Sequence, residues 1–107
     1  MNKDKFKEII SRLEALELND DFVHEQCWKE EVAVLAEDVD GTMEYLKKEC
    51  TENEYSWISE VIDDLIEATK SKELLECYKG LGAKYPDACK MYNIDRIIKY
   101  AEPFVEE

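Results

Sequence analysis

The chain has 107 residues, enough for one domain and too few for two separate hydrophobic cores. Its 27 acidic residues outnumber 14 basic ones, and the resulting net charge of −13 opposes direct binding to nucleic acid or to an anionic membrane. Apolar residues make up 45%, too many for a disordered acidic tail, while three glycines and two prolines disfavour a turn-rich β architecture.

Helical periodicity begins near the N-terminus. Residues 3–18 carry an apolar side chain at every third or fourth position, which predicts an amphipathic helix. The Asn-Asp-Asp sequence at residues 19–21 breaks that helix and offers an N-cap to the next stretch. We expect residues 22–39 to form one long helix or two short ones. Residues 40–42, Asp-Gly-Thr, predict a turn with a capping hydroxyl, and residues 43–50 predict another helical face.

The clearest helix starts at a capping box. In Thr51-Glu52-Asn53-Glu54 the hydroxyl can accept from a free backbone N–H while the last carboxylate reaches back to the cap. Apolar residues then recur at helical spacing as far as Ile66, which predicts one continuous helix with a wide buried face.

Three more helices complete the expected fold. Ser71 caps the first, Pro86 ends it and starts a short helix through Tyr92, and Asn93 caps a last helix that stops before Pro103. No segment alternates between apolar and polar residues with a period of two. The sequence therefore predicts an all-α domain of five to seven helices over residues 1–107.

Part of the chain repeats with an offset of 29 residues. Trp28-x-x-Glu31-Val32 matches Trp57-x-x-Glu60-Val61, and Thr42-x-Glu44-Tyr45-Leu46 matches Ser71-x-Glu73-Leu74-Leu75. We interpret residues 27–85 as two stacked helix–turn–helix units of the HEAT-like kind. Residues 1–26 then form an N-terminal helical segment and residues 86–107 the C-terminal helices. The alternative is two ordinary helical hairpins that are alike by chance.

The negative charge is concentrated in the middle of the chain. Residues 30–67 hold thirteen acidic residues and only two lysines, a net charge of −11. Like charges at helical spacing cost stability, so we interpret this region as a docking surface for a basic partner. The alternative is a solvated face that keeps the protein soluble. Two tyrosines at the edges of the apolar stripes are expected to anchor the same partner. The candidate contact residues are Glu37, Asp38, Asp40, Glu44, Tyr45, Glu52, Tyr55, Glu60, Asp63, Asp64 and Glu67.

No sequence motif predicts catalysis, a metal site or a cofactor. His24 and Cys27 could share a helix face, but two ligands are too few for zinc, and the four cysteines show no Cys-x-x-Cys spacing. An EF-hand register on Gly41 would put Ala36 in the first ligand position. We also expect neither a signal peptide nor a membrane span, because the first residues contain no apolar run and no stretch has about 20 apolar residues. We therefore expect a cytoplasmic protein that is not an enzyme, and its cysteines to be reduced small hydrophobic residues.

A family resemblance adds to this interpretation. The run Glu49-Cys50-Thr51-Glu52-Asn53-Glu54-Tyr55-Ser56-Trp57-Ile58-Ser59-Glu60-Val61, with Ser71-Lys72-Glu73-Leu74 and Lys84-Tyr85-Pro86, resembles small bacterial HEAT-like helical proteins. These are similar to immunity proteins of contact-dependent inhibition and other polymorphic toxin systems. The resemblance covers roughly residues 27–102.

The resemblance implies a cytosolic protein that binds one toxin domain, as a monomer in a 1:1 complex, and blocks its active site. Where the toxin is an RNase, for example of the EndoU type, the acidic face would meet the basic RNA-binding cleft. Two other functions remain open from the sequence. A non-inhibitory helical adaptor would bind its partner through an apolar groove, and a small carboxylate-metal enzyme would require a bound divalent ion.

Overall fold

The computed structural model describes residues 1–16 and 21–105, and helices joined by short turns make up these two ranges. No strand and no helix that could span a membrane occurs among the described residues. The all-α prediction is therefore confirmed, with one α-helix more than the expected upper number. The helices are α1 (Lys3–Ala15), α2 (Asp21–Glu37), α3 (Val39–Lys48), α4 (Glu52–Ile58), α5 (Ile62–Thr69), α6 (Lys72–Lys84), α7 (Pro86–Met91), α8 (Ile94–Ala101) and the 3-10 helix η1 (Glu102–Phe104).

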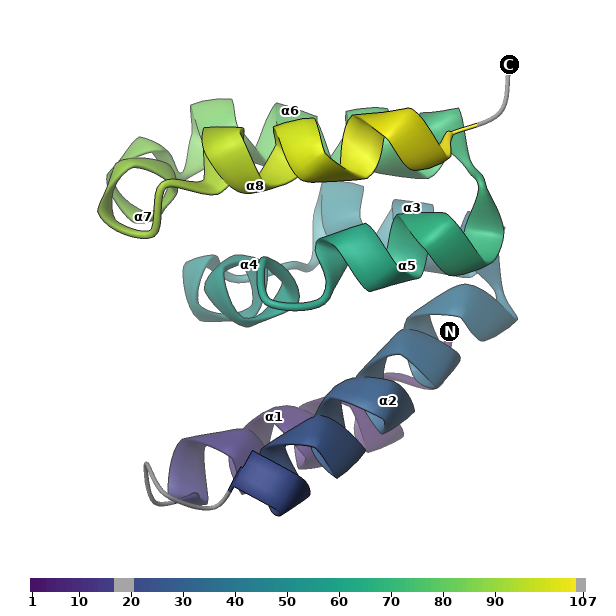
Figure 1. Ribbon diagram of the computed structural model, residues 1–107, viewed down its shortest axis with the longest axis vertical. Helices are drawn as coiled ribbons and strands as arrows, with labels where there is room; N and C mark the ends of the chain where they lie inside the picture. Colours follow the sequence, from purple (N-terminus) through teal and green to yellow (C-terminus); the bar gives the residue numbers. More distant parts are fainter. Residues whose placement is uncertain (17–20, 106–107) are drawn as a thin grey trace.

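The helices form two layers, each three helices deep (Figure 1). One layer contains α2, α5 and α8, in which α2 packs on α5 and α5 on α8. The other contains α1, α3 and α6, in which α3 packs on α6. The short helices α4 and α7 contact each other at one end of the stack. The hairpin formed by α2 and α3 thus stacks on the one formed by α5 and α6, as expected of stacked helix–turn–helix units.

The core follows the apolar periodicity of the sequence. Every α-helix except the short α7 buries side chains at three- and four-residue steps, as α1 does with Phe6, Ile9, Ile10 and Leu13. Two tyrosines link α4 to α6: the Tyr78 hydroxyl donates to the Tyr55 carbonyl at 2.8 Å, and the centroids of the two rings lie 4.9 Å apart. All four cysteines are free thiols, and Cys27, Cys50 and Cys89 are buried.

The predicted continuous helix after Thr51 is wrong, because a turn divides it into α4 and α5. The turn bonds run from Glu60 N to Trp57 O and from Val61 N to Ile58 O, each spanning three residues instead of four. The Ser59 hydroxyl adds a bond to the Ser56 carbonyl. The capping box at Thr51 is confirmed in both directions, and Ser71 caps α6 through Leu74 N as predicted.

Two other helix ends differ from the prediction. The helix α3 begins at Val39 with Asp38 as its N-cap, so residues 40–42 lie inside the helix. The buried Thr42 hydroxyl donates to the Leu35 carbonyl at 2.8 Å instead of capping. Asn93 precedes α8 in a left-handed conformation, with a φ of 55°, and its side chain makes no capping bond. The predicted helix break at residues 19–20 lies outside the described residues.

Candidate acidic interface on helices α2 and α5

Apart from Glu52, the predicted acidic contact residues separate into two groups, and the first surrounds the start of α3. The Asp38 carboxylate accepts hydrogen bonds from the Met1 amine at 3.0 Å and from Gly41 N at 3.1 Å, which together lower its pKa. Glu44 pairs with Lys48 at 2.9 Å, and this bond lowers the Glu44 pKa. Glu37 and Asp40 are exposed beside them. Two of these four acids, Asp38 and Glu44, are therefore already engaged by groups of the same chain.

The second group, which we call the acidic row, consists of Glu60, Asp63, Asp64 and Glu67. Glu60 lies in the turn before α5, and the other three lie on α5. No ion pair between residues of the described ranges involves any of the four. Partial burial and the neighbouring charges of Asp63 and Glu67 raise the pKa of Asp64. The dipole at the N-terminus of α5 favours acids in the first turn, but here it does not offset burial and repulsion.

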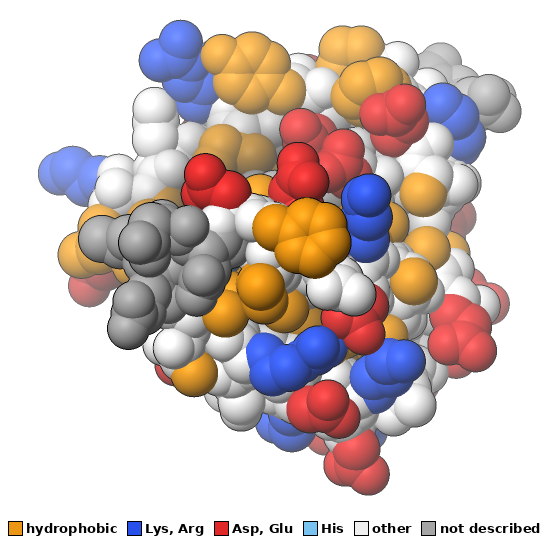
Figure 2. Space-filling view, turned by 60° about the horizontal axis from the view of Figure 1, so that its bottom comes forward, with side chains coloured by type: hydrophobic (Ala, Val, Ile, Leu, Met, Phe, Trp, Pro, Cys, Tyr) orange, Lys and Arg blue, Asp and Glu red, His pale blue; other side chains and the backbone are white. Residues whose placement is uncertain are grey.

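A groove of about 410 Å³ runs beside the acidic row, between α2 and α5. Trp28 and Val32 provide its apolar surface, and Asp64 faces them from α5. Glu25 and Lys29 complete the lining from α2. Figure 2, in which the α1–α2 end of the molecule comes forward, shows acidic side chains gathered beside hydrophobic ones near the middle of this face. The arrangement provides an aromatic contact surface next to carboxylates.

Glu60 links the acidic row to α2. Burial raises the pKa of Glu60, while the Trp28 indole and the positive form of His24 act in the opposite direction. The rings of His24 and Trp28 lie 5.7 Å apart. No hydrogen bond of normal geometry satisfies the buried Trp28 Nε1. Glu60 itself is exposed, so a partner that supplied a cation to its carboxylate would gain binding energy here.

Glu31 is a buried acidic residue next to the site that sequence reasoning missed. It lies within α2, is fully buried, and neither carboxylate oxygen has a hydrogen-bond partner among the described residues. Burial, and secondarily the charge of Glu60, raises the pKa of Glu31 to about 8. The 29-residue sequence repeat aligns Glu31 with Glu60, but the two positions differ in structure, because Glu31 lies within α2 and Glu60 lies in a turn. That repeat was the only signal in the sequence, and it did not indicate burial.

The expectation for the two tyrosines is wrong. Tyr45 is 1% exposed and Tyr55 is 0% exposed, so neither ring can anchor a partner. Tyr45 packs edge-on against Phe6, with ring centroids 5.8 Å apart, and donates its hydroxyl to Glu54 at 2.7 Å. Glu52, by contrast, is exposed in the first turn of α4.

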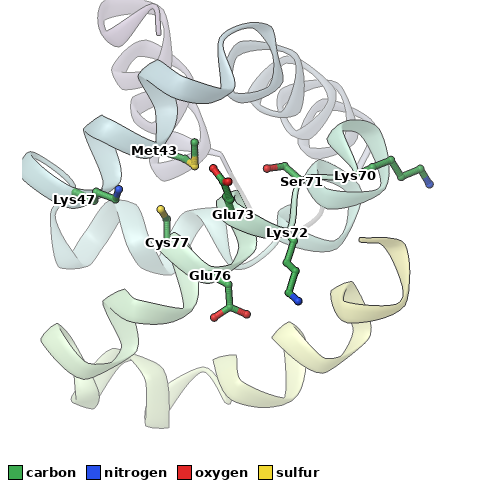
Figure 3. A pocket seen from close by; sticks show the side chains of 8 residues that line it. All are labelled: Met43, Lys47, Lys70, Ser71, Lys72, Glu73, Glu76 and Cys77. Carbon is green, nitrogen blue, oxygen red and sulfur yellow. The ribbon is translucent and has the colours of Figure 1, made fainter. Parts of the chain in front are cut away.

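A hollow of about 710 Å³ lies between α3 and α6, away from the acidic row (Figure 3). Three lysines and two glutamates line it, so its charge is mixed. In Figure 3 the Lys70 side chain points away from the other labelled groups, and its Nζ lies 5.7 Å from the Phe104 ring centroid. The lysines therefore do not converge on a common ligand position.

Comparison with known proteins leaves the site to be argued from its own residues. No family model, curated protein or solved structure matches the chain. Within the described residues, no group of three or more His, Cys, Asp or Glu side chains is arranged to hold a metal ion. What the site offers is an uncompensated acidic surface beside an aromatic groove.

Repulsion within the acidic row predicts a measurable effect on stability. Glu67 repels Asp64 and Asp63, which precede it by three and four residues. Replacing Glu67 with glutamine removes this repulsion, so we expect it to raise the free energy of unfolding by about 0.3 kcal/mol at low salt. The gain should shrink in 1 M salt, where the charges are screened. Glu44→Gln is the matched control, since it removes an attractive pair with Lys48 and should destabilise instead. Urea unfolding of both variants tests this; the same sign in both would contradict it.

Proposed function

We propose that this chain is an immunity protein that binds and neutralises a basic bacterial toxin domain, a nuclease. The observation that carries the proposal is the acidic row, whose four carboxylates form no ion pair within the described ranges. Two of the four acids near α3 are engaged within the chain, whereas the acidic row keeps its charge available. The sequence resemblance to immunity proteins of polymorphic toxin systems supports the same function.

The physical argument is charge complementarity. A nuclease needs a basic cleft to hold phosphates, and an inhibitor can occupy that cleft with carboxylates in their place. The groove between α2 and α5 adds Trp28 and Val32 as apolar contact beside the charges. Aromatic contact next to charged groups favours slow dissociation, because the charge pairs are then shielded from water. For an EndoU-type RNase, the acidic row would cover the RNA-binding cleft.

The direct test pairs the chain with the toxin domain that this proposal expects in the adjacent reading frame. We expect a 1:1 complex by calorimetry at micromolar concentration, and we expect the purified chain to block cleavage of an RNA substrate. An absence of complex would reject the immunity function. Binding without inhibition, with an affinity nearly independent of salt, would instead support a helical adaptor.

Charge reversal tests the docking face. We expect Asp64→Lys with Glu67→Lys to lower the association rate constant at least tenfold at low salt and to flatten its dependence on ionic strength. The matched control is Glu73→Lys with Glu76→Lys, which makes the same change in net charge in the hollow between α3 and α6. Stopped-flow mixing measures both rates. Equal decreases in the two double variants would show that only the net charge matters and would remove the acidic row as the contact.

A further inference from the structure

A second groove, the α4–α7 groove, lies where the two short helices contact each other (Figure 1). It consists of two adjoining hollows, of about 190 and 230 Å³, that share Asn53, Ser56 and Tyr92 in their linings. Asn53, Ser56 and Tyr92 do not belong to the predicted contact surface. Glu60 lines one of the hollows, so the groove continues from the acidic row.

The charge of this groove has one sign. Four carboxylates line it, from Glu14, Glu52, Glu60 and Asp87, and its lining contains no lysine or arginine. None of the four forms an ion pair with another residue of the described part of the chain. The groove therefore attracts cations and repels nucleic acid or an anionic membrane surface.

The same groove exposes large apolar side chains. Met91 is 74% exposed and Tyr92 is 52% exposed. Trp57 lines one hollow together with Tyr92, and Met91 lines the adjoining one. An exposed apolar patch bordered by charge is typical of a protein-binding surface. A simple cation would leave this apolar surface in water, so the occupant must carry apolar groups as well as positive charge.

We propose that the α4–α7 groove binds a segment of the partner protein that combines lysine or arginine with apolar side chains. The basic groups meet Glu52, Glu60 and Asp87, while an apolar side chain packs on Met91 and Tyr92. This inference rests on the proposed function, since the segment belongs to the toxin domain docked on the acidic row. It adds a second apolar contact to the one that Trp28 and Val32 provide in the groove between α2 and α5.

The test compares two surfaces against the same toxin domain. We expect the groove variant, Met91→Ser with Tyr92→Ser, to weaken binding at least tenfold through faster dissociation, with an unchanged association rate. Tyr100→Ser is the matched control, because that tyrosine is 57% exposed on another helix, and it should change affinity less than twofold. If the toxin binds and the groove variant dissociates like the wild type, the groove is not a contact, although the proposed function stands.

A peptide probe separates the two proposals if no toxin complex forms. The probe is a ten-residue peptide of alternating lysine and leucine, and the control peptide has serine in place of leucine. We expect the lysine–leucine peptide to bind the wild type at least fivefold more tightly than the control peptide, and the groove variant to abolish that difference. Under these results the groove binds basic apolar segments even where the immunity function fails. Equal binding of both peptides, or an unaffected groove variant, would overturn the inference.

Discussion

Replacing Glu31 with glutamine is expected to stabilise the protein by about 3 kcal/mol at pH 7. The carboxyl has a pKa of about 8 in the folded protein against an ordinary value of 4.5, and each unit corresponds to about 1.4 kcal/mol. The folded state thus holds a proton that the unfolded state releases, so stability falls as the pH rises from 4.5 towards 8. Glutamine cannot ionise, and it removes this loss.

The measurement is urea unfolding of the wild type and of Glu31→Gln between pH 4 and pH 8.5. The two curves should meet near pH 4.5 and diverge steadily above it, with the variant more stable. Glu31→Leu should also be more stable at pH 8, because it leaves no unpartnered polar atom in the core. A wild-type stability that stays level or rises across this range would show that Glu31 is satisfied by a group that the structure does not provide.

Glu54, the other buried glutamate, should respond in the opposite way. Its carboxylate accepts from the Tyr45 hydroxyl at 2.7 Å and from Thr51 N at 3.1 Å, and it lies 3.4 Å from Lys7 Nζ. Glu54→Leu should lower the free energy of unfolding by about 3 kcal/mol, since it removes the capping box and leaves the buried hydroxyl without an acceptor.

Chemical unfolding at pH 7 checks this prediction, with Glu52→Ala as the control. Glu52 is exposed in the same helical turn, so its removal should change stability by less than about 0.5 kcal/mol. A loss below about 1 kcal/mol for Glu54→Leu would mean that water replaces the carboxylate. The pair of glutamates shows that burial alone does not decide whether an acid stabilises a fold; its hydrogen-bond partners do.

The fold was largely predictable because helix faces and caps are local features. Residues such as Phe6, Ile9 and Leu13 are buried where their spacing indicated, and Thr51 and Ser71 cap the helices that they precede. The break between α4 and α5 was not predictable in this way. Ile58, Val61 and Ile62 are all buried on either side of it, so the apolar period continues through the turn.

The candidate site was only partly predictable, because charge counts do not reveal partners. Glu44 and Glu67 each have a lysine three residues later in the sequence, yet of the two only Glu44 forms an ion pair within the described residues, and it does so with Lys48. Burial of Tyr45 and Glu31 depends on how rows of helices stack, which no local pattern encodes. The α4–α7 groove was missed for the same reason: Asn53 and Tyr92 are far apart in the chain and meet only through tertiary packing.

The positions of the two tryptophans have a practical consequence for solution work. Trp28 lines the groove between α2 and α5, and Trp57 lines the groove between α4 and α7. Each surface therefore contains its own intrinsic fluorophore, and the sequence has no third indole to obscure the signal. Single-tryptophan variants made with Trp28→Phe or Trp57→Phe would report occupancy of the two surfaces separately, through emission shifts and quenching, without any attached dye.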